Sequence, residues 1–215
     1  VPSLAFLTWS MVALTRYLDS RRNFLLYVSA LLLLAAVYTK ISAAFVLPVF
    51  ALAILTERGV SAFRDRHVWL TALLVVVGLV PIAILTVKFG GANVQSIVGV
   101  ADSQVSRTSF AGWAWYARQM PALVGWPLLV LATFPPIATF FGRIQRNLTR
   151  SEVVLLVSWF AFGYLALSSI DLKEARHAVL IVPPILVSAA LSTSIPLVPR
   201  KLAQAIFFVS VAGTG

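Results

Sequence analysis

The sequence has no cysteine and little charge. Without cysteine, disulfides and thiolate-bound metals are excluded. Charged residues make up only 11% of the chain, against roughly a quarter in soluble globular domains. Hydrophobic residues make up 60%, and the mean hydropathy is +0.94. These values exclude a water-soluble domain, and we expect an all-α integral membrane protein.

Sequence motifs of soluble enzymes are also missing. The chain has no glycine-rich phosphate loop ending in Gly-Lys-Ser or Gly-Lys-Thr, and no nucleophile elbow. Its two histidines, His67 and His177, do not form a pair at metal-ligand spacing. The residues therefore predict no protein metal site and no cofactor, while a requirement for a divalent metal stays open.

The positive charge of the chain has a membrane explanation. A net charge of +10 would indicate nucleic acid in a soluble protein. Here the charges lie almost entirely in short segments between apolar runs, which is the pattern that orients spans in a bilayer. We therefore expect membrane lipids, and not nucleic acid, as partners.

The apolar runs predict the number of spans. A transmembrane helix needs about 20 apolar residues, within a range of about 17 to 25. Runs near that length predict seven spans and a partial eighth, in a polytopic helical bundle that forms a single domain over residues 1–215. The runs lie near residues 1–17, 24–39, 41–56, 68–87, 121–141, 153–170, 178–195 and 202–215. Residues 88–120 form a predicted external segment. Because the chain opens at Val1 in apolar sequence and stops within another apolar run, we expect a fragment cut at both ends.

Orientation follows from the basic residues. If the loop after the first span is cytoplasmic, eleven basic residues fall on the cytoplasmic side and six on the other, which agrees with the positive-inside rule. The six on the non-cytoplasmic side are Lys40, Lys88, Arg107, Arg118, Lys173 and Arg176. The protein is therefore predicted to be multi-pass, in the inner or plasma membrane if prokaryotic, with its active side non-cytoplasmic.

Lys40 is a lone charge in the apolar stretch from Phe24 to Thr56. A charge at membrane depth is costly and usually faces a cavity, a partner or a substrate. The two runs beside it have about sixteen residues each, or about 24 Å, against a hydrocarbon core about 30 Å thick. We expect Lys40 below the membrane surface, where it either snorkels to the head groups or faces an anionic lipid-linked substrate. Pro48 and Pro81 are expected to kink their spans.

A second polar cluster covers residues 171–177, on the same predicted side as Lys40. Arg176 and His177 run directly into the next span, where Pro183-Pro184 should distort the helix about two turns further on. The cluster is either a solvated loop with a loose ion-pair network or the mouth of a cavity. Trp113, Trp115 and Tyr116 are interpreted as an interfacial aromatic belt, or as part of a helix that lies on the membrane and borders a substrate entrance. Trp69, Trp126 and Trp159 are interpreted as anchors near span ends.

Three stretches in this order resemble a known family. They are Val1 to Leu18, Tyr38-Thr39-Lys40 with the run to Pro48, and Lys173-Glu174-Ala175-Arg176-His177 with Pro183-Pro184. They are similar to polytopic glycosyltransferases of the GT-C class, especially dolichyl-phosphate-mannose protein mannosyltransferases and bacterial aminoarabinose transferases of lipid A.

The resemblance implies transfer of a hexosyl or pentosyl group from a polyprenyl-phosphate carrier, undecaprenyl or dolichyl, to a protein, lipid or glycan. It places Lys40 and Arg176 at the carrier phosphate, with Lys173 and His177 in the same donor site. The family usually has tyrosine where this chain has His177. Its catalytic base is an acidic residue of the first external loop, which we expect upstream of Val1.

The leaving-group chemistry agrees with this assignment. Negative charge develops on the polyprenyl phosphate as the glycosidic bond breaks, and fixed cations stabilise it strongly in a low-dielectric cavity. The external acids within the chain are Asp102, Asp171 and Glu174. Asp171 is a possible supporting residue, by pairing with Arg176.

Two other functions remain open. The first is a secondary transporter or flippase for an anionic lipid or solute, which would have a repeat between its halves and interrupted helices. No repeat is evident in the sequence. The second is a non-enzymatic assembly subunit in which Lys40 pairs with an acid of a partner.

Overall fold

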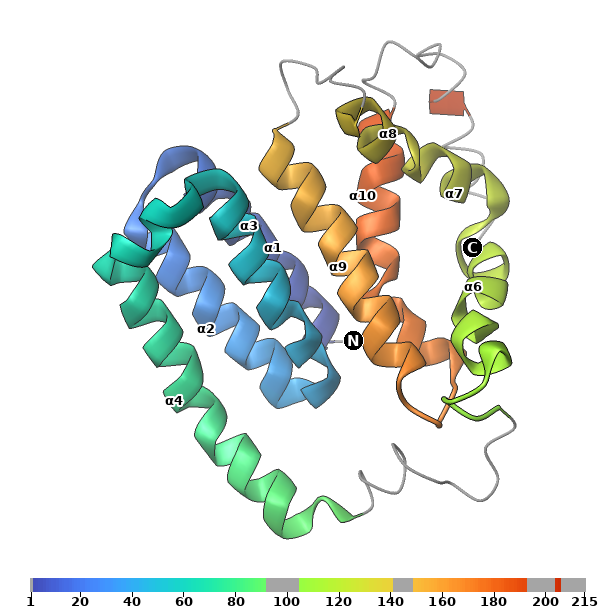
Figure 1. Cartoon of the computed structure of the whole chain (residues 1–215), viewed down its shortest axis with the longest axis horizontal. Helices are drawn as coiled ribbons and strands as arrows, with labels where there is room; N and C mark the ends of the chain where they lie inside the picture. The colour runs from blue at the N-terminus through green and yellow to red at the C-terminus, as the bar shows by residue number, and fades with distance from the viewer. Residues whose placement is uncertain (1, 92–104, 141–148, 193–203, 206–215) are drawn as a thin grey trace. The chain divides into compact units, whose positions relative to one another are not determined.

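The structure is a computed structural model of the chain and describes residues 2–91, 105–140, 149–192 and 204–205. All secondary-structure elements in these ranges are helices (Figure 1), which confirms the predicted α-helical class. The chain divides into two compact units. The first comprises residues 1–103 and 170–172, and the second comprises residues 104–169 and 173–215.

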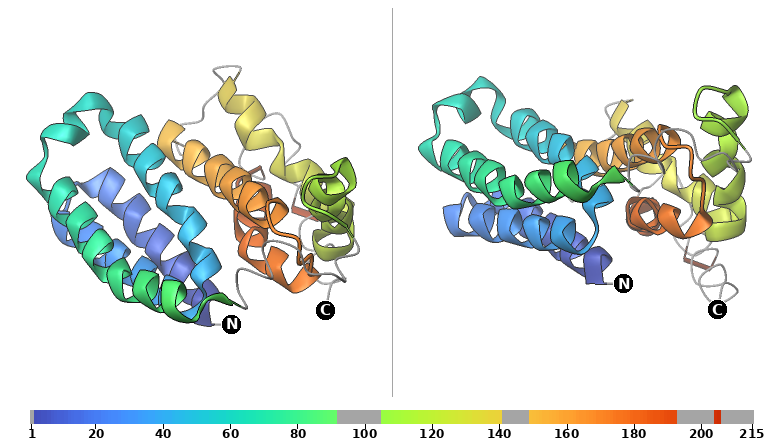
Figure 2. Two further views of the ribbon diagram at one scale, coloured as in Figure 1. Left: turned by 60° about the horizontal axis from the view of Figure 1, so that its bottom comes forward. Right: turned by 90° about the horizontal axis from the view of Figure 1, so that it is seen from below.

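The first unit is built from long helices joined by tight connections. Its described elements are α1 (Pro2–Ser20), α2 (Asn23–Thr39), the 3-10 segment η1 (Ile41–Val46), α3 (Leu47–Arg58), the 3-10 segment η2 (Gly59–Arg64) and α4 (Arg66–Phe89). Figures 1 and 2 both show α1 and α2 side by side, and α2 also packs against α4. Only two residues, Arg21 and Arg22, join α1 to α2, so these helices must run antiparallel.

The interface between α1 and α2 is held by small residues and hydroxyl groups. Ser10 Oγ donates to the carbonyl of Ser29 at 2.7 Å, and Ser3 Oγ donates to the carbonyl of Ala36 at 3.1 Å. Ala30 and Ala36 are fully buried. Small side chains let two helix backbones approach closely, and interhelical hydroxyl bonds stabilise helix pairs in lipid. The pair therefore has the packing chemistry of membrane helices.

The second unit carries shorter, more broken helices. Its described elements are α6 (Phe110–Val124), α7 (Trp126–Ala132), α8 (Phe134–Phe140), α9 (Arg150–Ser168), the 3-10 segment η3 (Ala175–Leu180) and α10 (Val182–Ser192). α10 packs against α7, α8 and α9. α9 starts with a capping box in which Thr149 and Glu152 satisfy each other's backbone N–H groups.

Three helical segments are long and apolar enough to cross a membrane: Ile41–Arg64, Arg66–Phe89 and Arg150–Ser168. A bent pair, Phe110–Val124 with Trp126–Phe140, makes a fourth if it is counted as one span. The apolar helices α2 and α10 are shorter. The span predicted at 202–215 lies outside the described residues except for 204–205. A membrane protein is supported, and the count of seven to eight spans stays a prediction.

The span predicted at 121–141 is wrong as one straight helix. α6 already begins at Phe110, within the segment predicted to be external, and ends at Val124, where the axis turns by 110°. Gly125 has φ 87°, and its N–H closes α6 by donating to the carbonyl of Pro121 at 3.0 Å. Glycine adopts a positive φ at little steric cost, which lets the chain end α6 and turn at this residue. Pro127 then fits the first turn of α7, where its missing N–H leaves no bond unmade.

Candidate functional site

The first part of the candidate site is the helix break at Lys40. α2 ends at Thr39, and Lys40 has an extended backbone with φ −155° and ψ 107°. Its N–H still donates to the carbonyl of Ala36 at 2.9 Å, and its carbonyl accepts from Ala43 N–H at 2.9 Å. The side chain of Lys40 is half-buried. Its extended backbone interrupts the helical hydrogen bonding between α2 and η1.

Pro48 explains why η1 precedes α3. In an α-helix the carbonyl of Ala44 would accept the N–H of residue 48, but proline has none. The Ala44 carbonyl accepts the N–H of Leu47 instead, which is a 3-10 bond. Pro48 thus lies in the first turn of α3, where proline is tolerated. The predicted kink is a change of helix type at this residue.

Of the two short runs predicted on either side of Lys40, only the first is short in the structure. The first arm, α2, has 17 residues. The second arm was predicted to end at Thr56, but the helical stretch continues to Arg64 over 24 residues and is long enough to cross a membrane. The predicted depth of Lys40 therefore rests on α2 alone.

The second part of the candidate site is a similar break between α9 and α10. The span predicted at 178–195 is two pieces, because η3 ends at Leu180 and α10 begins at Val182. Pro184 has no N–H for the carbonyl of Leu180. The indole Nε1 of Trp159 donates to that carbonyl at 2.9 Å from α9. Trp159 is 2% exposed, so its structural role is a buried donor, and the prediction of an interfacial anchor is wrong.

Lys173 is held against the end of α9. Its Nζ donates to the carbonyl of Ser168 at 2.6 Å and to that of Leu167 at 3.3 Å. The same Nζ lies 5.7 Å from the ring centroid of Tyr116. A cation at a helix C-terminus satisfies unbonded carbonyls and interacts favourably with the helix dipole, and a cation over an aromatic face is attracted to it. Lys173 therefore positions the loop between α9 and η3.

Glu174 connects the other two predicted residues. Arg176 donates to both of its carboxylate oxygens, from Nε and, at 3.0 Å, from Nη2. His177 Nε2 lies 3.3 Å from Oε2 of the same carboxylate. The Arg176 side chain is 77% exposed, whereas that of His177 is 19% exposed. The partner of Arg176 is thus Glu174 and not Asp171, as was considered from the sequence.

The structure places three of the five predicted residues in the second unit. Arg176 and His177 both contact Glu174, and Lys173 precedes Glu174 in the chain. Lys40 and Asp171 belong to the first unit, and Asp171 is buried, with 7% exposed. A shared site of Lys40 with the other cations stays a prediction.

Two further residues belong to the second break. Glu174 was recognised only as an external acid, although its place two residues before Arg176 could have predicted the pair. Tyr116 was assigned to an interfacial belt, but it is fully buried, and its hydroxyl has no hydrogen-bond partner among the described residues. No sequence pattern predicts this, since Tyr116 reaches Lys173 from another helix.

The second break offers a guanidinium, an imidazole and a carboxylate within one turn of chain. An exposed bidentate arginine–carboxylate pair can exchange its carboxylate for a phosphate, because the two groups match the same donor fork. Within the described residues, no group of three His, Cys, Asp or Glu side chains could hold a metal ion. None of the known protein families, curated proteins or solved structures compared with this chain matches it.

Proposed function

We propose that this chain is part of a membrane glycosyltransferase that takes a sugar from a polyprenyl-phosphate carrier on the non-cytoplasmic side. The observation that supports it best is the exposed fork of Arg176 at the start of η3, in the break between α9 and α10, next to His177. In the proposed donor complex, the carrier phosphate replaces Glu174 as the partner of Arg176. The resemblance of Lys40 and Arg176 to the donor-site positions of GT-C enzymes adds to this support.

The structure changes the roles within that proposal. Lys173 is engaged by the end of α9 and acts as a positioning residue, since its Nζ already contacts two carbonyls and a ring. Glu174, released by the phosphate, would remain 3.3 Å from His177 Nε2. A carboxylate beside an imidazole can hold a proton close to the leaving phosphate. The resemblance to GT-C enzymes implies an acidic residue of the first external loop as the base that activates the acceptor.

The test is a transfer assay on the full-length protein in lipid nanodiscs. The donor is a polyprenyl-phosphate-linked sugar, and the product is free polyprenyl phosphate, detected by mass spectrometry. The proposal expects release of polyprenyl phosphate that requires an added acceptor fraction. An intact donor after incubation with periplasmic or lumenal acceptor fractions would contradict it.

A transporter or flippase for an anionic lipid is the second candidate, because each unit holds a proline-interrupted helix. Lys40 precedes Pro48, and Arg176 precedes Pro184, by eight residues in both cases. Interrupted helices in corresponding positions of two halves are typical of transporter binding sites. In proteoliposomes this function would move the intact anionic lipid between leaflets with no change in its mass.

A further inference from the structure

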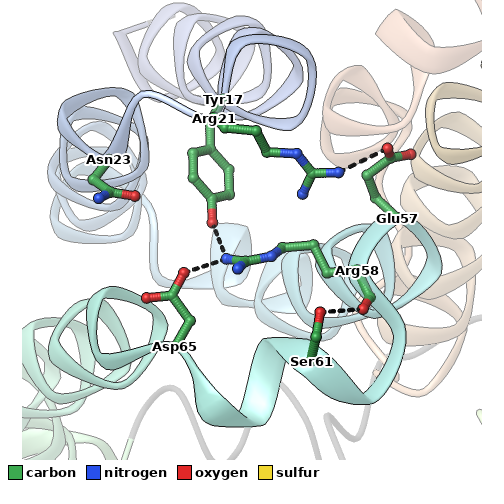
Figure 3. A pocket seen from close by; sticks show the side chains of 7 residues that line it. All are labelled: Tyr17, Arg21, Asn23, Glu57, Arg58, Ser61 and Asp65. Carbon is green, nitrogen blue, oxygen red and sulfur yellow. Dashed lines mark hydrogen bonds and ion pairs between the residues drawn. The ribbon is translucent and has the colours of Figure 1, made fainter.

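A polar pocket lies at the end of the first unit away from Lys40. It has a volume of about 370 Å³ and is lined by Tyr17, Arg21, Asn23, Glu57, Arg58, Ser61 and Asp65 (Figure 3). These residues come from the end of α1, the connection to α2, the start of α2, the end of α3, η2 and the residue before α4. Since Asn23 begins α2 and Lys40 follows its end, the pocket and Lys40 lie at opposite ends of that helix.

Two ion pairs form the walls of this pocket. Arg58 Nη1 donates to the carboxylate of Asp65 and, at 2.7 Å, to the hydroxyl of Tyr17. Arg21 Nη2 donates to Glu57 Oε1 at 2.9 Å. Asp65 also accepts the N–H of His67 as the N-cap of α4. Its hydrogen bond from Arg58 holds the pKa of Asp65 below the usual value, so this carboxylate stays ionised and fixed.

Both guanidinium groups keep donors that these walls do not use. A guanidinium has five N–H groups on three nitrogens. Arg58 makes its bonds through Nη1 and Arg21 through Nη2, so Nε and one further nitrogen of each arginine have no hydrogen-bond partner within the described residues. Figure 3 shows the two guanidinium groups in the same pocket, one from the connection between α1 and α2 and one from the end of α3. Guanidinium donors from two arginines in one pocket suit a tetrahedral oxyanion, because arginine forms charge-assisted hydrogen bonds with phosphate.

The backbone at Arg21 is unusual in a way that supports a binding role. Arg21 has φ 58°, and no other described residue except glycine has a positive φ. Its N–H donates to the carbonyl of Tyr17 at 2.8 Å, so it closes α1 where glycine is the ordinary residue. Arginine in this conformation has a conformational cost that glycine would avoid. The side chain that it brings lines the pocket.

The surroundings of the pocket identify where the oxyanion comes from. Phe24, Val60 and Phe63 lie beside pocket residues and are 72%, 81% and 58% exposed. Residues 16–23 and 57–67 together hold six arginines and three acids. Exposed apolar groups next to surplus positive charge are typical of a surface at the head-group level of an anionic leaflet.

We propose that this pocket binds the phosphate group of an anionic membrane lipid, through the unused N–H groups of Arg21 and Arg58. The shared chemistry is phosphate recognition, and the lipid is the expected source because apolar side chains border the pocket. Arg58, fixed by Tyr17 and Asp65, supplies the rigid half of the site. Arg21 supplies the exchangeable half, since it can leave Glu57 for the phosphate.

The test uses the full-length protein released from nanodiscs of phosphatidylcholine with phosphatidylglycerol, with bound lipids counted by native mass spectrometry. Arg21→Gln is compared with Arg22→Gln. The control removes the same charge from the neighbouring residue, whose side chain does not line the pocket. We expect Arg21→Gln to retain about tenfold less phosphatidylglycerol than Arg22→Gln, as the loss of a charged hydrogen bond predicts. Glu57→Gln, which frees Arg21, should retain more than the wild type.

Two further measurements distinguish loss of binding from loss of stability, and a lipid from free phosphate as the ligand. Arg21→Gly suits φ 58° and should keep or raise the Tm while it loses the bound lipid. Inorganic phosphate is added to the protein in neutral detergent, and a rise in Tm that Arg21→Gln abolishes would support a phosphate site filled from solution. Equal retention of phosphatidylglycerol by Arg21→Gln and Arg22→Gln, without a phosphate-dependent rise in Tm, overturns the proposal.

Discussion

The two helix breaks use the same device and are stabilised differently. In both, a 3-10 segment precedes an α-helix with proline in its first turn, because the proline leaves a carbonyl without its usual donor. At the first break the Ala44 carbonyl is satisfied within the same segment, by Leu47 N–H. At the second break the Leu180 carbonyl needs Trp159 from α9. The first break is thus encoded locally, while the second depends on tertiary packing.

The cations differ in the same way. Lys40 follows the last residue of α2 and precedes η1, and its backbone makes the local bonds that join them. At the second break the work is divided, since Lys173 holds the end of α9 and Arg176 pairs with Glu174 at the surface. Because Lys173 and not Arg176 bonds to the end of α9, we expect that Arg176 can exchange its partner without loss of the fold.

The largest expected effect is at Arg176. Arg176→Ala should lower the rate of sugar transfer by about a hundredfold, because loss of one fixed donor at a developing oxyanion has roughly that effect. Arg176→Lys keeps the charge but not the planar donor fork, so its rate should lie between those of the wild type and Arg176→Ala. The measurement is kcat/KM for the donor lipid, with the exposed Arg118→Ala in α6 as the control. A rate equal to that control would remove Arg176 from the donor site.

The next largest effect tests the tertiary support of the second break. Trp159→Phe leaves the buried Leu180 carbonyl without its donor, and we expect a loss of about 1 to 3 kcal/mol in the free energy of unfolding. The control is Trp69→Phe, which removes a bond to the Phe63 carbonyl near solvent. Thermal unfolding in detergent measures both. Equal changes in Tm would mean that the second break does not depend on α9.

A smaller effect distinguishes a positioning lysine from a phosphate ligand. Lys173→Met should cost about 0.3 to 1 kcal/mol of stability through its lost interaction with the end of α9. We expect the KM for the donor lipid to stay unchanged, because the ammonium group already donates to the carbonyls of Ser168 and Leu167. An unchanged Tm with a raised KM would restore Lys173 to the phosphate site predicted from the sequence.

The smallest effect compares the prolines directly. Pro48→Ala supplies a donor for the Ala44 carbonyl, so amide exchange in the peptide around η1 should slow, with less than about 1 kcal/mol change in stability. Pro184→Ala should alter exchange less, since the Leu180 carbonyl already accepts from Trp159. Hydrogen–deuterium exchange by mass spectrometry resolves both peptides. Larger slowing in Pro184→Ala would reverse the comparison.

The sequence predicted the features that single residues determine. Apolar composition predicted helices and membrane character, and Pro48 and Pro183-Pro184 predicted interruptions close to where η1 and η3 end. Gly125 followed by Trp126-Pro127 is the signal for the bend after α6. The prediction missed it because the surrounding run is continuously apolar. Such a run is compatible with a straight span and with a bent pair, so only the glycine and proline chemistry distinguishes them.

The remaining features depend on contacts between helices. Tyr116 lies in an aromatic sequence that resembles a membrane belt, and only the approach of Lys173 explains its burial. Trp159 likewise resembles an interfacial anchor in the sequence. Its structural role depends on the Leu180 carbonyl, which lacks an N–H donor from Pro184 and accepts from the indole instead. The pair of Arg176 with Glu174 was open to prediction, because only one residue separates them in the sequence.

The most direct test of the donor site is binding of a polyprenyl phosphate to the full-length protein in nanodiscs of neutral lipid. Affinity is measured for the wild type, Arg176→Ala and Arg118→Ala. The account predicts that the wild type and Arg118→Ala bind alike and that Arg176→Ala binds at least about tenfold more weakly. Equal affinity in all three proteins would contradict a phosphate site at the break between α9 and α10.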